Sequence, residues 1–343
     1  MARYLGGLLT ADESQVLPSN NYENTSGNAI FTSDEQYLLN ISNRWPTAGN
    51  SLQRGLFMGG YASDLINTVQ YFDLSTTGDA ADFGDLTGVR YSNAGFASSS
   101  RGCSAGGTSD GGGTPTANID YFTFTTLGNA SDFGDLPGVR WVFCGTSNNT
   151  TGLTFSGQDA SGRINNIDYT TIASLGTTGD FGDVSSGTYN NAGACASTTR
   201  ALRGGGHDGS AGATNVTDYV TIASAGNSTD FGDLTVARQA VGGLSSNTRG
   251  VFAGGLSAGQ NVIDYFTIAS TGNATDFGDL TINRPYPYTT SNKTRGVIAG
   301  TNASSLTIDQ ITVASTGNAT DFGDMIADSY AGACCSSAHG GIA

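Results

Sequence analysis

Aromatic and polar positions recur along this chain with a long, nearly constant period. The phrase Asp-Phe-Gly-Asp occurs six times, at positions 82–85, 132–135, 180–183, 230–233, 276–279 and 321–324. Twelve residues before each Phe stands a member of the series Tyr71, Tyr121, Tyr169, Tyr219, Tyr265 and Gln310. Eight residues after each Phe stands a member of the series Tyr91, Trp141, Tyr189, Gln239, Pro285 and Tyr330. Because both separations hold in six copies, they define internal repeats of about 48 residues.

Within one repeat, hydrophobic runs alternate with breaks rich in glycine, asparagine and serine. The copy from Arg238 to Thr281 predicts strands at 240–245, 250–253 and 262–269 and around 277–281. Such strand–turn–strand signals, four to a unit of about 40 to 50 residues, are typical of one blade of a β-propeller. The sequence therefore predicts an all-β propeller.

Composition supports an all-β chain, and the net charge disfavours some classes of binding partner. The chain has 51 Gly and only 13% charged residues, and its three Glu all lie within the first 35 positions, so strong helix formers are scarce. The formal net charge of −15 disfavours binding to nucleic acid and to anionic membranes. It is compatible with cations and with neutral or basic partners.

The five cysteines predict free thiols rather than a disulfide framework. Their number is odd, no CxxC pair occurs, and they lie in runs of small apolar residues, as at Cys195. We therefore expect folding in a reducing cytoplasm. The first residues lack the hydrophobic region of a signal peptide, and no stretch of 18 apolar residues predicts membrane insertion.

The order of glycines, aromatics and arginine in the repeat resembles the kelch motif. One copy has Gly59-Gly60, Tyr71, Phe83 and Arg90, and another has the equivalent set Gly254-Gly255, Tyr265, Phe277 and Arg284. The departures are Phe where the kelch motif has Trp, and broken glycine pairs at 156–157 and 299–300. The resemblance covers residues 44–343 and implies a kelch-like propeller.

The repeat sequence, for example residues 263–281, is also similar to repeats in tail-associated virion proteins of marine bacteriophages. This resemblance implies a protein of the virion tail that is assembled in the host cytoplasm. It also implies other virion proteins as partners and leaves a homo-oligomer open.

The way the ring closes follows from the two ends of the repeat array. Complete repeats extend over about 44–326, and we expect a closing blade formed by residues 28–43 together with 327–343. This arrangement predicts seven four-stranded blades within residues 28–343. The alternative is six blades with a spare hairpin. Residues 1–27 lie outside the repeat and are interpreted as an arm that docks on another virion protein.

Two sets of residues are candidates for ligand binding, because loops between blades and between second and third strands share one face of a propeller. The first set forms the channel mouth and could stack on sugar rings or pack between blades: Trp45, Tyr91, Trp141, Tyr189, Tyr286, Tyr330 and Arg140. The second set lies in long variable loops, where binding residues concentrate on rigid scaffolds: Asp110, Asp159, Arg163, His207 and Asp208. The alternative for the second set is that these loops are solvated insertions.

Catalytic and metal chemistry have little support. The chain has only two histidines, and neither a catalytic triad nor a cluster of metal ligands is recognisable, so we predict no catalytic residue, no metal and no cofactor. The paired carboxylates of Asp-Phe-Gly-Asp leave Ca²⁺ as an alternative, although capping Asp and a Phe between blades explain the sixfold repetition better.

These observations order three functional hypotheses. The first is a non-enzymatic virion propeller that binds a host surface glycan or protein through its loop face. The second is an architectural or decoration protein of the virion. The third is a glycan-cleaving propeller, because the 29 acidic residues leave a carboxylate pair possible.

Overall fold

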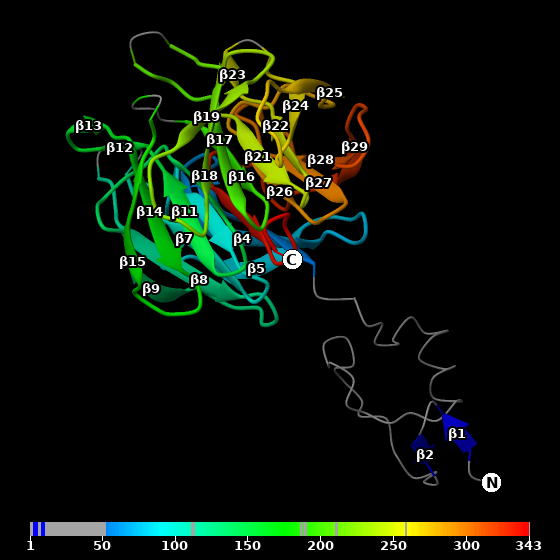
Figure 1. Cartoon of the computed structure of the whole chain (residues 1–343). Coiled ribbons are helices and arrows are strands. Elements are labelled where there is room, and N and C mark those ends of the chain that lie inside the picture. The colour runs from blue at the N-terminus through cyan, green and yellow to red at the C-terminus, as the bar shows by residue number, and fades with distance from the viewer. Residues whose placement is uncertain are drawn as a thin grey trace. The chain divides into compact units, whose positions relative to one another are not determined.

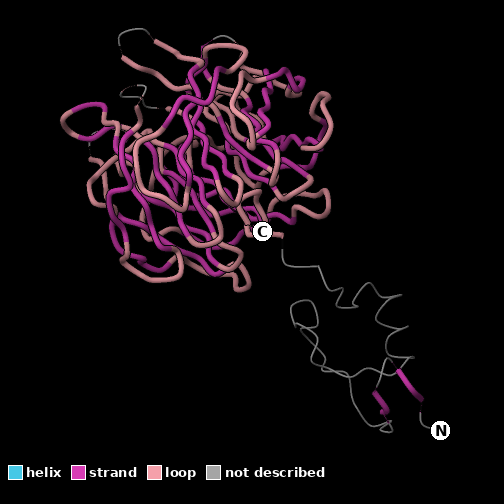
Figure 2. Tube along the Cα trace, viewed as in Figure 1, coloured by secondary structure: helices cyan, strands magenta, loops and turns pink. Residues whose placement is uncertain are grey.

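The computed structural model describes residues 3–5, 8–10, 53–110, 114–185, 187, 191–209, 212–257 and 259–342. Contacts along the chain separate two units, Met1–Leu52 and Gln53–Ala343. The described part of the first unit is one antiparallel pair, β1 (Arg3–Leu5) and β2 (Leu8–Thr10). The described part of the second unit contains strands and no helix (Figure 2).

The second unit is a β-propeller of six four-stranded antiparallel blades, arranged around a central axis (Figure 1). From the innermost to the outermost strand, the first three blades are as follows: blade 1, β30 (Ala333–Ser336), β3 (Arg54–Tyr61), β4 (Leu65–Asp73) and β5 (Ala81–Asp85); blade 2, β6 (Ala94–Ala97), β7 (Arg101–Ala105), β8 (Asn118–Thr123) and β9 (Ser131–Asp135); blade 3, β10 (Cys144–Ser147), β11 (Thr151–Phe155), β14 (Asn166–Thr171) and β15 (Thr178–Asp183).

The other three blades follow the same order: blade 4, β16 (Gly193–Ala196), β17 (Arg200–Gly204), β18 (Val216–Thr221) and β19 (Thr229–Asp233); blade 5, β21 (Gly242–Ser245), β22 (Arg249–Ala253), β24 (Val262–Thr267) and β25 (Thr275–Asp279); blade 6, β26 (Tyr288–Ser291), β27 (Arg295–Ala299), β28 (Thr307–Thr312) and β29 (Thr320–Asp324). Two small sheets lie outside the blades: β12 (Gln158–Asp159) with β13 (Gly162–Arg163), and β20 (Arg238–Gln239) with β23 (Leu256–Ser257). The four strands predicted in 238–281 are confirmed, with ends shifted by a few residues.

The ring has six blades, so the seven-blade prediction was wrong and the six-blade alternative is confirmed. Strand β30, from the C-terminal end of the chain, pairs with β3 and becomes the innermost strand of blade 1, with Ala333 opposite Met58 and Ser336 opposite Gly55. Each blade needs one outermost strand, and the repeat supplies six of them. Strand β30 therefore completes blade 1, whose other strands are β3, β4 and β5, and does not begin a seventh blade. Of the residues expected in a seventh, closing blade, 28–43 lie outside the described part, and 337–342 form no further strand after β30.

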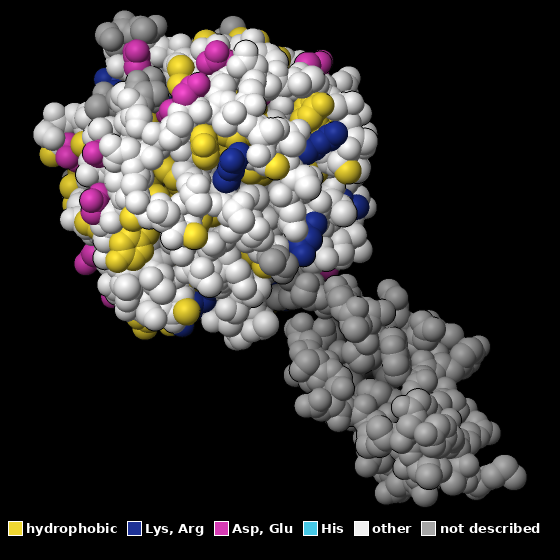
Figure 3. Space-filling model, viewed as in Figure 1, with side chains coloured by type: hydrophobic (Ala, Val, Ile, Leu, Met, Phe, Trp, Pro, Cys, Tyr) yellow, Lys and Arg dark blue, Asp and Glu magenta, His cyan; other side chains and the backbone are white. Residues whose placement is uncertain are grey.

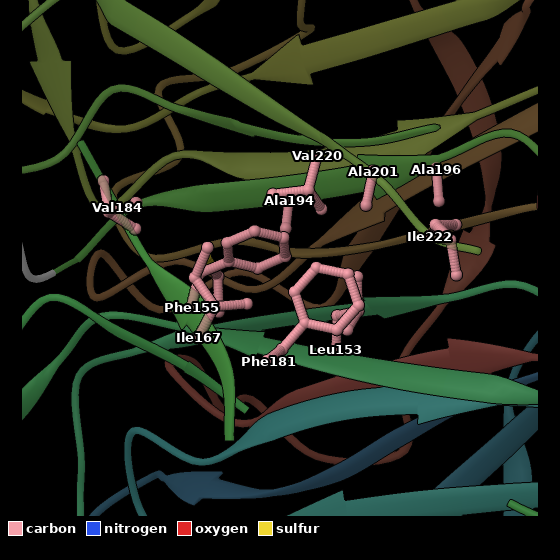
Figure 4. Packing of buried hydrophobic residues seen from close by; sticks show 12 residues of the cluster. Leu153, Phe155, Ile167, Phe181, Val184, Ala194, Ala196, Ala201, Val220 and Ile222 are labelled. Atoms are coloured by element: carbon pink, nitrogen blue, oxygen red, sulfur yellow. The ribbon is translucent and has the colours of Figure 1, made fainter. Parts of the chain in front are cut away.

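The hydrophobic core lies between neighbouring blades rather than in one central mass. In one cluster, Leu153, Phe155, Ile167 and Phe181 of blade 3 face Ala194, Ala196, Ala201 and Val220 of blade 4 (Figure 4). Each of the six repeated Phe side chains is at most 5% exposed. The expectation that these Phe residues fill the gaps between blades is confirmed.

The Asp-Phe-Gly-Asp phrase forms the outermost strand of each blade and docks on the next blade. At the first copy, the Phe83 carbonyl accepts a hydrogen bond from the Gly128 amide at 2.8 Å, and the Asp85 amide donates to Asn129 Oδ1 at 3.1 Å. Gly84 has a φ of +143°, and a Cβ there would lie 2.4 Å from the Gly128 carbonyl oxygen, so the position requires glycine. Main-chain docking therefore explains why the phrase recurs.

A buried carboxylate on the third strand ties each of five blades to an arginine. The pairs are Arg90–Asp120, Arg140–Asp168, Arg203–Asp218, Arg238–Asp264 and Arg284–Asp309. Four of these arginines lie in the linker that enters the blade. Blade 4 lacks a linker arginine, and Arg203 of β17 supplies the cation instead. In blade 1, Gln70 takes the place of Asp and binds the main chain of Ile326 and Ala327.

A second set of arginines connects neighbouring blades at the start of the second strands. Each donates through Nη1 to a main-chain carbonyl next to the third strand of the following blade: Arg54 to Phe124, Arg101 to Ile172, Arg200 to Ile268, Arg249 to Val313 and Arg295 to Leu74. Four of them also lie over the repeated Tyr, with guanidinium-to-ring distances of 4.5–4.8 Å. We call these five residues the latch arginines.

The narrow packing of the innermost strands gives a first prediction. A Cβ added at Gly95 would lie 2.1 Å from the Cys334 carbonyl oxygen in the closing strand. We expect Gly95→Ala to lower the free energy of unfolding by about 1–3 kcal/mol, because main chain must shift. The matched control is Gly88→Ala, where no atom lies within 4 Å of the added Cβ. Urea unfolding measures both, and equal stability of the two variants would contradict this packing.

The buried ion pairs give a second prediction. Asp264→Ala leaves the fully buried Arg238 guanidinium without its counter-ion, and we expect a loss of about 3–5 kcal/mol in the free energy of unfolding. The double variant Arg238→Leu/Asp264→Leu removes both charges and should recover part of that loss. Chemical denaturation of the three proteins measures it. A double variant that is no more stable than the single one would show that the orphaned charge is not the cause.

Candidate functional site

Two kinds of loop share one face of the propeller, which we call the mouth face. Main-chain bridges join the linker that enters a blade to the loop between its second and third strands, at Tyr91 with Thr108, at Trp141 with Gln158 and at Tyr330 with Tyr61. The expectation that inter-blade and second-to-third strand loops lie together therefore agrees with the structure.

A ring of main-chain hydrogen bonds surrounds the channel at the mouth face. Six residues, one entering each blade, have φ between +52° and +58°: Ser92, Val142, Asn191, Ala240, Tyr286 and Ala331. In five of them the amide donates to the carbonyl of the equivalent residue in the preceding blade, at 2.6–3.1 Å. The six equivalent positions thus share one backbone conformation. Their residue types do not predict it, because only one of them is Asn and none is Gly.

The channel behind this ring is too narrow to receive a sugar. Two cavities of about 110 and 50 Å³ lie along it, lined mainly by Gly, Ala, Ser, Thr and Cys of the innermost strands. Ligand pockets for small molecules usually enclose about 300–1,000 Å³. Binding of a glycan therefore requires the rim and loops of the mouth face, not the channel.

The residues after β30 close the channel at the opposite end. His339 Nε2 lies 3.1 Å from the Ala97 carbonyl oxygen and 3.2 Å from Ser147 Oγ, on blades 2 and 3. The Gly340 amide donates to the Ser245 carbonyl of blade 5 at 3.1 Å. Burial lowers the pKa of His339 to about 4, so the imidazole is neutral. The described end of the chain therefore acts as a plug.

Four tyrosines cluster at the rim of the mouth. The Tyr330 ring lies 5.7 Å from Tyr61, 6.5 Å from Tyr91 and 6.1 Å from Tyr286, between ring centroids. All four are partly exposed, and burial together with neighbouring tyrosines raises the pKa of Tyr286 and Tyr330. Three of the four were candidates from the sequence. Tyr61 was missed, although it directly follows the Gly59-Gly60 pair.

The other candidates of the mouth set have different positions. Trp141 is partly exposed and bridged to Gln158 on the mouth face, whereas Trp45 and Tyr189 lie outside the described residues. Arg140 is 3% exposed and ion-paired with Asp168. Its position favours a structural role over contact with a ligand, although the pair lies within blade 3 and not between blades as the alternative expected.

The candidate residues in the long loops are of two kinds: carboxylates that stabilise turns, and Arg163, which hydrogen-bonds to His207. Asp110 accepts hydrogen bonds from Thr108 and Thr114, and Asp159 accepts them from Ser161 and Gly162. These bonds lower the pKa of Asp159.

Asp208 Oδ1 likewise accepts a bond from the Gly212 amide at 3.1 Å. Arg163 of blade 3 instead reaches across to blade 4, where its Nη2 donates to His207 Nδ1 at 3.2 Å.

Metal and thiol chemistry receive no support from the described residues. Among them, no group of three or more His, Cys, Asp or Glu side chains could hold a metal ion. The five cysteines form no disulfide, and burial raises the pKa of the Cys103 and Cys144 thiols to about 12, which keeps them protonated.

The comparisons with known proteins add no relative. No protein-family model matches the chain, and no curated protein matches it. Within the part of the chain that the structure describes, no helix is long and apolar enough to cross a membrane.

The plug gives a third prediction, which concerns pH. The pKa of His339 is about 4 in the folded protein and about 6.5 when unfolded, so the unfolded state binds more protons between these values. Stability should fall as pH decreases from 7 to 5, by up to about 2 kcal/mol from this group. In His339→Gln this fall should be smaller. Thermal unfolding at both pH values compares the two proteins, and parallel curves would exclude His339 as the cause.

Proposed function

We propose that the chain is a non-enzymatic, kelch-like propeller of a bacteriophage virion, associated with the tail, which binds a host surface receptor through its mouth face. The observation that carries this proposal is the cluster of Tyr61, Tyr91, Tyr286 and Tyr330 at the rim. Partly exposed aromatic rings combine apolar faces with hydroxyl groups, which suits them to the faces and hydroxyls of a sugar.

The surface chemistry supports a glycan rather than a nucleic acid. The formal net charge is −15, and ten of the eleven arginines described in the propeller are engaged in the buried pairs and the latches. The visible face in Figure 3 is mostly uncharged and polar. Such a surface lacks the basic stripe that phosphate binding needs.

A binding role also agrees better than catalysis with the loop carboxylates. Asp110 and Asp159 accept several hydrogen bonds within their own loops, so they stabilise turns instead of facing one another as an acid–base pair. In this proposal, residues 1–27 attach the propeller to other virion proteins, and assembly takes place in the host cytoplasm. Attachment and location rest on the resemblance to phage tail proteins.

The fourth prediction tests the receptor-binding surface. Labelled full-length protein should bind saturably to intact cells or envelope fractions from a panel of marine bacteria. In Tyr91→Ala/Tyr286→Asn we expect at least a tenfold weaker Kd, because aromatic residues at the centre of an interface each contribute about 2 kcal/mol or more. Asn is chosen because it tolerates the positive φ of Tyr286.

The control is Leu127→Ser/Leu175→Ser, which changes two side chains that are 49% and 54% exposed at the opposite face. Its affinity should equal that of the parent protein. A well-folded parent that binds none of the cells or fractions would favour the architectural hypothesis. Release of reducing sugar from envelope glycans would favour the glycan-cleaving one.

A further inference from the structure

One arginine in the described propeller belongs neither to the buried ion pairs nor to the latch arginines. The buried pairs use five arginines and the latches use five, and both sets hold the blades together. The remaining one is Arg163, which is exposed on the mouth face and belongs to the β12–β13 hairpin inserted in blade 3. This hairpin projects beyond its blade (Figure 1).

The hairpin places Arg163 on the same side as an aromatic ring. Trp141 pairs with Gln158, and Gln158 pairs with Arg163, so the three residues lie opposite one another on three adjacent short segments. Directly opposed residues of antiparallel strands project from the same face. Neighbouring strands lie about 4.8 Å apart, so the main chains at Trp141 and Arg163 are about 10 Å apart. A sugar ring with an attached acidic group can span this distance.

The contact with the next blade orients hydrogen-bond donors toward this face. His207 Nδ1 accepts from the Gly209 amide at 2.9 Å and from Arg163 Nη2 at 3.2 Å, which assigns the proton of the neutral ring to Nε2. The Arg163 guanidinium lies against Gly209, where a Cβ would be 2.4 Å from Arg163 Nη1, and the φ of +85° at this position favours glycine. Among the described residues, the hydrogen bonds of the His207 and Arg163 side chains use His207 Nδ1 and Arg163 Nη2, which leaves His207 Nε2–H and the other guanidinium N–H groups as donors for a ligand.

Two carboxylates belong to the same loops, and both have partners of their own. Asp159 is held by Ser161 and Gly162, and Asp208 accepts from Gly212. No ion pair joins Arg163 to either of them among the described residues. On a protein with a net charge of −15, an anion gains nothing from long-range attraction, so it must be bound through short, directional contacts.

We propose that Trp141, Arg163 and His207 form a subsite for a carboxylate-bearing sugar unit of the host glycan, an inference that rests on the proposed receptor-binding function. The planar guanidinium of Arg163 binds the carboxylate with two parallel hydrogen bonds, and His207 Nε2–H donates to a second acceptor of the same unit. The indole of Trp141 packs against the face of the sugar ring. The four tyrosines, on the other side of the rim around blade 1, contact neutral units farther along the same glycan.

The test uses the full chain on an array of carboxylated, sulfated and neutral oligosaccharides, with the same proteins also applied to bacterial cells. The parent protein should prefer carboxylated glycans over their methyl esters, which keep the shape but lose the charge. Arg163→Ala should weaken that binding at least tenfold. Arg163→Lys should lose almost as much, because an ammonium group cannot form the paired hydrogen bonds. Trp141→Ala should weaken it as well.

The matched control is Lys293→Ala, which removes one exposed positive charge from a loop at the opposite face and should leave binding unchanged. Thermal unfolding of Arg163→Ala should match that of the parent. A decrease in Tm like that of the latch variant Arg101→Ala would assign Arg163 to loop packing and overturn the proposal.

Other outcomes separate this subsite from the receptor-binding function. If Arg163→Ala binds cells normally while Tyr91→Ala/Tyr286→Asn does not, the acidic-sugar subsite is wrong and the receptor-binding function stands. Preference for sulfated or neutral glycans would also overturn the subsite. If the parent protein binds neither glycans nor cells, both proposals fail.

Discussion

The structure depends on burying the apolar face of each blade against the next blade. Every repeated Phe lies in such an interface, and each core cluster draws its side chains from neighbouring blades. A single four-stranded blade would leave this surface in water, so the ring must close. Strand β30 closes it by joining the two ends of the propeller in one sheet, which also leaves no innermost strand unpaired.

Polar interactions fix the geometry that hydrophobic burial alone would leave loose. The buried arginine–aspartate pairs anchor the linkers, the latch arginines connect second and third strands of successive blades, and the ring of main-chain bonds sets the channel diameter. A buried charge is strongly destabilising when its partner is missing, so both members of each pair are needed. Blade 1 has no such pair: Gln70 stands in the position of the Asp and hydrogen-bonds to the main chain of Ile326.

In the proposed function, the mouth face of the propeller is the surface that recognises the receptor. The channel is filled by small residues and plugged by the segment around His339, so a ligand has access to the rim and its loops alone. There the repeat is least regular: tyrosines gather on one side, around blade 1, and the inserted β12–β13 hairpin carries Arg163 on the other, next to blade 4. Departures from the repeat, rather than the repeat itself, give the surface its chemical character.

The sequence by itself determined the strand order, the propeller architecture and the burial of the repeated Phe, because these follow from local periodicity and spacing. It also placed Tyr91, Tyr286 and Tyr330 near one rim. The structure corrected the number of blades, since which sheet the last strand joins depends on pairing between residues more than 270 positions apart. Only the structure shows that Arg140 and Asp168 are buried and form an ion pair. Their sequence signal was present, as an Asp before the repeated Tyr in four copies and before Gln310 in the fifth, but its arginine partner comes from two different elements and was therefore not recognisable.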